Sequence, residues 1–227
     1  MARRGWLASD TWETIFGLAY LVFGTNAFLT MMSLPLIIVL ITTDPLQSWP
    51  LLALTAVLAA PALAGAFGAF RSYSVDKDGA IAHAFMRTWR QLFWRSLLFG
   101  VISVGALVIA GVDFVAAQHL RYGAVIIPIV TVFATLANIA ALLGLVASVE
   151  RPESRIRDAL KVGLYFGVRR WYLTLVSALA FVSLAALFLT HPALGLGLAA
   201  SPLLYAVWGN SRYSLQPVLA PSGGGAA

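Results

Sequence analysis

Residues 51–95 read LLALTAVLAAPALAGAFGAFRSYSVDKDGAIAHAFMRTWRQLFWR. The first twenty of these residues carry no charge, whereas the remaining twenty-five include five Lys or Arg side chains. A helix of about 20 apolar residues crosses the hydrocarbon core of a bilayer, which is about 30 Å thick. Cationic segments beside such helices resist transfer across the membrane. This stretch therefore predicts a membrane-spanning helix followed by a connection at the inner surface.

The rest of the chain repeats this alternation of apolar and cationic segments. Of its 227 residues, 60% are hydrophobic and 11% are charged, and the mean hydropathy is +0.87. Lipid offers no partners for backbone N–H and C=O groups, and the apolar stretches lack the alternation of a barrel strand, so each must be helical. We therefore expect an all-α, polytopic membrane helix bundle. The six predicted transmembrane helices cover residues 14–42, 51–70, 96–112, 124–149, 171–190 and 193–210.

The distribution of cations predicts the orientation of the chain. Fourteen of the fifteen Lys and Arg residues lie before the first span, in alternate connections or after the last span, and Arg121 alone lies on the opposite side. The positive-inside rule then places both termini in the cytoplasm. The weakest point is the last pair of spans, because only residues 190–192 form the turn between them.

The net charge of +6 and the isoelectric point of about 10.1 have a second consequence. Because the cations flank membrane spans and form no basic domain, we expect them to bind anionic lipid of the inner leaflet and no nucleic acid. We expect a single integral membrane domain over residues 1–219. Residues 220–227, which are rich in Gly and Ala, are expected to form a flexible tail.

Both cationic inner connections contain a predicted amphipathic helix, at about residues 79–94 and 154–167. The apolar face of the first helix comprises Ile81, Phe85, Trp89 and Phe93, and its cationic face includes Arg87 and Arg90. Such helices lie in the cytoplasmic interface of the membrane. The two connections resemble each other, which leaves open a weak internal repeat or a basic and aromatic belt that arose twice.

The second predicted span carries a stripe of small side chains, Ala56, Ala60, Ala64 and Gly68. Residues four apart lie on one helix face, and small side chains let another helix backbone approach closely. The stripe can serve packing within the chain, or it can receive a helix of a partner protein.

Two amides, Asn26 and Asn138, lie near the middle of the first and fourth predicted spans. An amide in hydrocarbon is costly unless it finds a partner. We expect both to face protein and to bond each other or a backbone carbonyl, either joining helices or contacting a substrate.

Four prolines interrupt predicted spans: Pro35, Pro61, Pro128 and Pro202. Each removes a backbone donor and frees a carbonyl, which predicts kinks. Kinks of this kind shape a cavity or fit neighbouring helices together.

Charged residues are missing from the central part of every predicted span. Proton- or ion-driven carriers bind their ions at such positions, so that class is disfavoured. The sequence also lacks cysteine, a phosphate-binding Gly-rich loop and the spacing of a metal site. We therefore predict a protein that is not an enzyme, with no catalytic residues, no cofactor and no metal.

Three segments resemble the YesL family of small bacterial integral membrane proteins, whose shared domain has no assigned function. They are Asn26-Ala-Phe-Leu-Thr-Met-Met-Ser-Leu-Pro35, Pro61-Ala-Leu-Ala-Gly-Ala-Phe-Gly-Ala-Phe-Arg71 and Ala84-Phe-Met-Arg-Thr-Trp-Arg-Gln-Leu-Phe-Trp-Arg95. The resemblance covers roughly residues 12–110. Members are often encoded beside carbohydrate ABC importers and glycan-degrading enzymes, so it implies an accessory role in sugar uptake. It supplies no catalytic residues.

Two functional hypotheses follow. The first is a non-enzymatic accessory or scaffold protein that binds another membrane protein, such as the permease subunits of a carbohydrate ABC importer. The second is a small facilitator of uncharged solutes or a lipid-binding transporter, in which the kinked spans and the two amides would shape a path.

Overall fold

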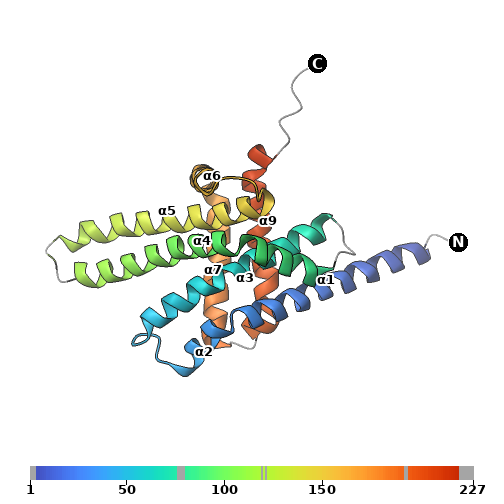
Figure 1. Ribbon diagram of the computed structural model, residues 1–227, viewed down its shortest axis with the longest axis horizontal. Helices are drawn as coiled ribbons and strands as arrows, with labels where there is room; N and C mark the ends of the chain where they lie inside the picture. Colours follow the sequence, from blue (N-terminus) through green and yellow to red (C-terminus); the bar gives the residue numbers. More distant parts are fainter. Residues whose placement is uncertain (1–3, 76–79, 119, 121, 192–193, 220–227) are drawn as a thin grey trace, which may run out of the picture.

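The computed structural model describes residues 4–75, 80–118, 120, 122–191 and 194–219, and all regular structure within these ranges is helical. Figure 1 shows α4 and α5 as an antiparallel pair that extends to the left, past an upright pair formed by α7 and α9. The elements are α1 (Arg4–Met32), α2 (Leu34–Thr42), α3 (Trp49–Val75), α4 (Ile81–Ala117), α5 (Gly123–Glu150), α6 (Ile156–Arg169), α7 (Trp171–Thr190), the π-helical segment η1 (Gly195–Ala199) and α9 (Ala200–Leu219).

Five helices within the described ranges are long and apolar enough to cross a membrane: α1, α3, α4, α5 and α7. The chain thus has the multi-pass helical character that its hydropathy predicts. The sixth expected span, 193–210, is not among the five. Residue 193 lies outside the described residues, and the remainder forms η1 and the first half of α9. Because α9 includes Ser, Asn, Arg and Gln residues, it is less apolar than the other long helices.

The first expected span, 14–42, is two helices and not one. The chain breaks at Ser33, which has φ −98° and ψ 9°, and Pro35 is one of the first residues of α2. Proline has no N–H to donate to the carbonyl four residues earlier, here that of Met31, and its ring crowds that carbonyl, so the helix is interrupted just before it. The nine residues of α2 are too few to cross a bilayer alone.

The first expected interfacial helix and the third expected span are not separate helices. Both belong to α4, which is one continuous helix of 37 residues. No proline interrupts residues 81–117, and single glycines do not break a helix. At 1.5 Å per residue, α4 is about 55 Å long, well beyond the hydrocarbon thickness. Residues 81–94 are therefore no separate helix but the first part of α4; residue 79 lies outside the described residues.

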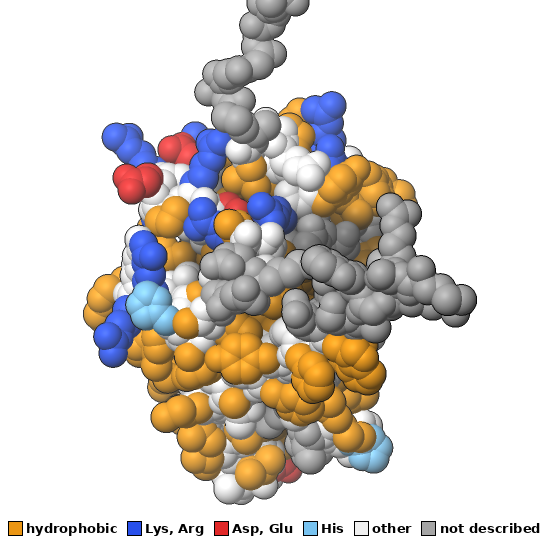
Figure 2. Space-filling model, turned by 90° about the vertical axis from the view of Figure 1, so that its right-hand side faces the viewer, with side chains coloured by type: hydrophobic (Ala, Val, Ile, Leu, Met, Phe, Trp, Pro, Cys, Tyr) orange, Lys and Arg blue, Asp and Glu red, His pale blue; other side chains and the backbone are white. Residues whose placement is uncertain are grey.

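The core lies where the second half of α3 meets α4, the last third of α5 and α9. Phe67, Phe70, Phe85 and Phe99 are buried there, together with Val146 of α5. Lipid is as apolar as these side chains, so van der Waals packing against closely approaching helices holds the core together. On the face drawn in Figure 2, Lys and Arg side chains gather in the upper part and hydrophobic side chains cover the lower part.

Candidate functional site

Asn26 of α1 is buried, and its amide forms hydrogen bonds with the backbone where η1 meets α9. Its Nδ2 donates to the carbonyl of Gly197 at 2.9 Å, and its Oδ1 accepts from the backbone N–H of Ser201 at 2.8 Å. In an α-helix these two backbone groups would bond each other, because they are four residues apart. The Asn26 amide therefore takes the place of one hydrogen bond of the helix, at the junction of η1 and α9.

Two further polar side chains lie at this level. Thr25 and Ser201 are buried, and within the described part of the chain neither hydroxyl has a hydrogen-bond partner. Neither group carries a charge. Together with the amide of Asn26, they form an uncharged polar layer that joins α1 to the start of α9.

Asn138 of α5 does not meet Asn26 but bonds α4 instead. Its Oδ1 accepts from Ser103 Oγ at 2.6 Å, and its Nδ2 donates to the carbonyl of Ala134 at 2.9 Å. The second bond lies within α5 itself, so only the contact with Ser103 joins two helices. The two amides thus serve different helix pairs.

The small-residue stripe of α3 packs against α4. Ala60, Ala64 and Gly68 are buried and Ala56 is half-buried. A methyl group on Gly68 would overlap Thr88, 2.5 Å from its Cβ, and a methyl group on Gly100 would lie 2.8 Å from the Cβ of Ala60.

The expected kink positions differ from one another. Pro35 follows the break between α1 and α2, whereas α3 and α5 run through Pro61 and Pro128 without interruption. Pro202 is the third residue of α9, directly after the π-helical segment. Pro61 is buried against the core, and the other three are exposed.

The side chains expected on the first interfacial helix lie at the start of α4, and they differ in how far they are buried. Ile81 and Phe85 are buried in the protein core, Trp89 and Phe93 are half-buried, and Arg87 and Arg90 are exposed. The ring of Phe85 stacks on Phe28 of α1, with 5.1 Å between ring centroids. The apolar face of residues 81–93 thus contacts protein more than the sequence pattern predicted.

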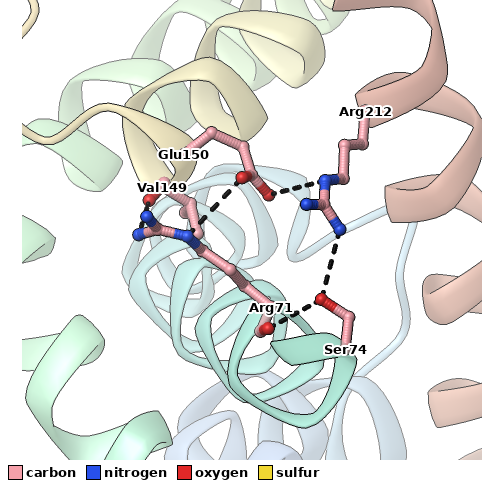
Figure 3. A network of polar contacts seen from close by, with 5 residues as sticks. All are labelled: Arg71, Ser74, Val149, Glu150 and Arg212. Atoms are coloured by element: carbon pink, nitrogen blue, oxygen red, sulfur yellow. Dashed lines mark hydrogen bonds and ion pairs between the residues drawn. The ribbon is translucent and has the colours of Figure 1, made fainter. Parts of the chain in front are cut away.

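A charged cluster joins the ends of α3, α5 and α9, as Figure 3 shows. Glu150 lies between Arg71 and Arg212, with ion-pair distances of 3.5 and 3.8 Å, and its side chain is only 7% exposed. Arg71 Nη1 also donates to the carbonyl of Val149 at 2.9 Å, and Arg212 Nη1 donates to Ser74 Oγ at 3.1 Å. Cationic groups at the end of α5 also favour its dipole. We name Arg71, Ser74, Glu150 and Arg212 the inner cluster.

Two more arginines bind carbonyl groups near the inner cluster. Arg95 of α4 donates to the carbonyls of Pro152 and Ser154, in the connection that follows α5. Arg170 donates to the carbonyl of Tyr213 in α9 at 2.8 Å and stacks over the ring of that residue. Cations that the sequence suggests as topology signals therefore also hold helix ends together.

Sequence reasoning missed the inner cluster and one further packing motif. A signal for the cluster was available, because Glu150 is an acidic residue that ends an apolar stretch, but nothing in the sequence pairs it with Arg71 or Arg212. The motif is Gly163-x-x-x-Gly167 on α6, where a methyl group on Gly163 would lie 2.9 Å from the carbonyl oxygen of Ala140 in α5. This glycine pair brings α6 close against α5.

The variant Glu150→Gln tests whether the inner cluster stabilises the fold. We expect this change to lower the free energy of unfolding by about 1 kcal/mol, because both arginines are about two-fifths exposed and solvent screens the pairs. A thermal melt of the detergent-solubilised protein, followed by tryptophan fluorescence, measures the loss. Glu153→Gln is the matched control, since Glu153 is exposed. Equal melting of the two variants would contradict a stabilising role for the cluster.

Among the described residues, no group of three or more His, Asp or Glu side chains comes together as a metal site. The polar layer around Asn26 offers neutral donors and acceptors, and the inner cluster offers paired charges whose arginines reach solvent. These arrangements suit helix joining and the binding of polar or anionic groups.

Comparison with known proteins gives one match. Residues 14–114 match the family model described as a protein of unknown function, DUF624. No curated protein and no solved structure matches the chain. From within α1 through most of α4, the chain is therefore similar to DUF624, the family of unknown function that includes the YesL proteins.

Proposed function

We propose that the protein is a non-enzymatic membrane scaffold that binds a transmembrane helix of another membrane protein through the outer half of α5. The observation that supports this function most is a second stripe of small side chains, this one uncovered. Ala124, Pro128, Thr131 and Thr135 are all exposed and follow one another at spacings of four, three and four. Such spacings place them on one face of α5.

The hydroxyl groups of this stripe are already satisfied. Thr131 Oγ1 donates to the carbonyl of Ile127 at 2.8 Å, and Thr135 Oγ1 donates to the carbonyl of Thr131 at 2.7 Å. The surface is therefore smooth and presents no unpaired donor, as suits close approach of a second helix. The stripe of α3, in contrast, already contacts α4.

The position of the stripe also favours a partner. In Figure 1 the outer halves of α4 and α5 extend beyond the other helices. Large apolar side chains to one side of the stripe are exposed, among them Val125 and Val132. A partner helix on this arm would be held by the small-residue stripe and flanked by these side chains.

We further propose six crossings, with both termini in the cytoplasm of a bacterium. Support for the sixth comes from contacts at both ends of α7: Asn210 Nδ2 donates to the carbonyl of Leu173 at 3.2 Å, and a methyl group on Gly195 would lie 3.4 Å from the Cα of Phe188. Because η1 and α9 accompany α7 along its length, a crossing by α7 requires a return by α9. The distribution of cations supports the orientation.

The partner we propose is a permease subunit of a carbohydrate ABC importer. Its support is the resemblance to the YesL family, whose members are often encoded beside such importers. The role is accessory, because the stripe supplies a contact surface and no group that reacts.

Thr131→Trp tests the scaffold function, because the bulky side chain would cover the small-residue stripe. We expect the variant, purified from the native host in mild detergent, to lose its co-purifying membrane protein at least about tenfold by quantitative mass spectrometry, in line with the loss of close helix packing. Val182→Trp on the exposed face of α7 is the control and should retain the partner. If the wild-type protein purified without any partner and transported sugar into liposomes by itself, the scaffold function would be wrong and a facilitator would be favoured.

A further inference from the structure

The exposed side of the first turns of α4 is cationic. His83, Arg87 and Arg90 are exposed and spaced by four and three residues, which places them on one helix face. With Met86 and Gln91 they line a shallow surface hollow of about 530 Å³. Gln91 is also exposed and adds an amide to the same hollow.

This face is held in place by the core behind it. Ile81, Phe85 and Leu92, on the opposite side of the same turns, are buried. A methyl group on Gly65 of α3 would lie 2.8 Å from the ring of Phe85, so the two helices are in close contact. The cations thus project from a helix that cannot turn without disturbing the core.

Aromatic residues show where this face lies relative to the bilayer. Trp94 is 80% exposed and contacts Phe93 edge to face, with 5.5 Å between ring centroids. Exposed tryptophan is enriched at the membrane–water interface. Arg90 precedes Trp94 by about one turn, or about 6 Å along the axis, and the apolar part of α4 begins just after it. Arg90 is therefore expected at the level of the lipid phosphates, with Arg87 about one turn further from the apolar part of α4.

Charge and geometry both suit a phosphate group. Within the described residues, the ion pairs are those of Arg71 and Arg212 with Glu150, so Arg87 and Arg90 have no ion-pair partner there. Arginine presents its N–H groups in a planar fork that bonds phosphate oxygens bidentately. We propose that His83, Arg87 and Arg90 bind the phosphate of an anionic glycerophospholipid.

A lipid suits this place better than a soluble anion. The face continues directly through Trp94 into a membrane-spanning segment, so a bound phosphate would have acyl chains alongside apolar helix surface. A zwitterionic lipid would bring its own cationic group against the arginines, which disfavours it. Gln91 is placed to bond a hydroxyl group of the lipid. The site does not depend on the scaffold function, which uses the other end of the α4–α5 pair.

The test is binding of phosphatidylglycerol to the full chain in detergent, followed by native mass spectrometry, with phosphatidylcholine as the comparison. The variant is Arg87→Gln with Arg90→Gln. We expect its affinity for phosphatidylglycerol to fall about 30-fold, or about fivefold for each cation removed. Phosphatidylcholine should bind the wild-type protein more weakly than phosphatidylglycerol.

The matched control removes the same charge elsewhere: Arg157→Gln with Lys161→Gln on α6, where both residues are exposed. It should leave binding of phosphatidylglycerol unchanged, and all variants should share the wild-type melting temperature. Equal loss in both double variants would overturn the site in favour of diffuse charge attraction. Displacement of phosphatidylglycerol by inorganic phosphate at matched concentration would overturn the assignment to a lipid.

Discussion

Replacing Gly68 by leucine is expected to lower the free energy of unfolding by about 3 kcal/mol. A single added carbon already overlaps Thr88 of α4, 2.5 Å from its Cβ, and both residues belong to helices that form the core. The four carbons of the leucine side chain would force α3 and α4 apart at this contact. Thermal unfolding in detergent, read by tryptophan fluorescence, together with the fraction eluting as a monodisperse species, measures the effect.

Gly105→Leu separates this packing effect from the general effect of adding leucine to a membrane helix. Gly105 lies on α4, and a methyl group there would meet no heavy atom within 4 Å. We expect this variant to have the same melting temperature as the wild-type protein. If the two leucine variants melted alike, the stripe of α3 would have no special role in holding α4.

Asn26→Leu is expected to lower the free energy of unfolding by about 2 kcal/mol. It leaves the carbonyl of Gly197 and the N–H of Ser201 without the amide that bonds both. An unpaired buried backbone group costs about 1–3 kcal/mol, and hydrogen bonds in membrane proteins are usually weaker than that. The same thermal melt measures the loss.

Asn138→Leu is the internal comparison, with an expected loss of about 1 kcal/mol, since only its contact with Ser103 joins two helices. We expect Asn26→Leu to be less stable than Asn138→Leu, and this order is a stricter test than either loss alone. An Asn26→Leu protein as stable as wild type would show that η1 relaxes into a regular helix, in which Gly197 and Ser201 bond each other directly.

Hydropathy was enough to predict the helical class and most of the spanning segments. Residues 51–70, 124–149 and 171–190 all lie within helices of the structure, because a long uncharged stretch has few ways to satisfy its backbone in lipid. The break at Ser33 has a local cause in Pro35, which the sequence also shows.

The continuous course of α4 and the partners of the polar groups could not be predicted in this way. Arg95 suggested a membrane boundary and therefore the end of one helix, yet a charged side chain does not stop a helix when it finds carbonyl partners in another connection. Likewise, the burial cost of Asn26 predicts that it has a partner, but the partner belongs to a segment whose place is set only by the packing of the whole chain.

The distances along the chain between bonded groups bear on how the protein is made. Asn26 is separated from its two partners by 171 and 175 residues, and Arg212 lies 138 residues beyond Ser74. A ribosome that feeds helices into the membrane one after another delivers α1 and α3 long before α9. Until η1 and α9 arrive, the amide of Asn26 lacks both of its partners and Glu150 has only Arg71 as an ion-pair partner, so the last segment of the chain completes both polar sites.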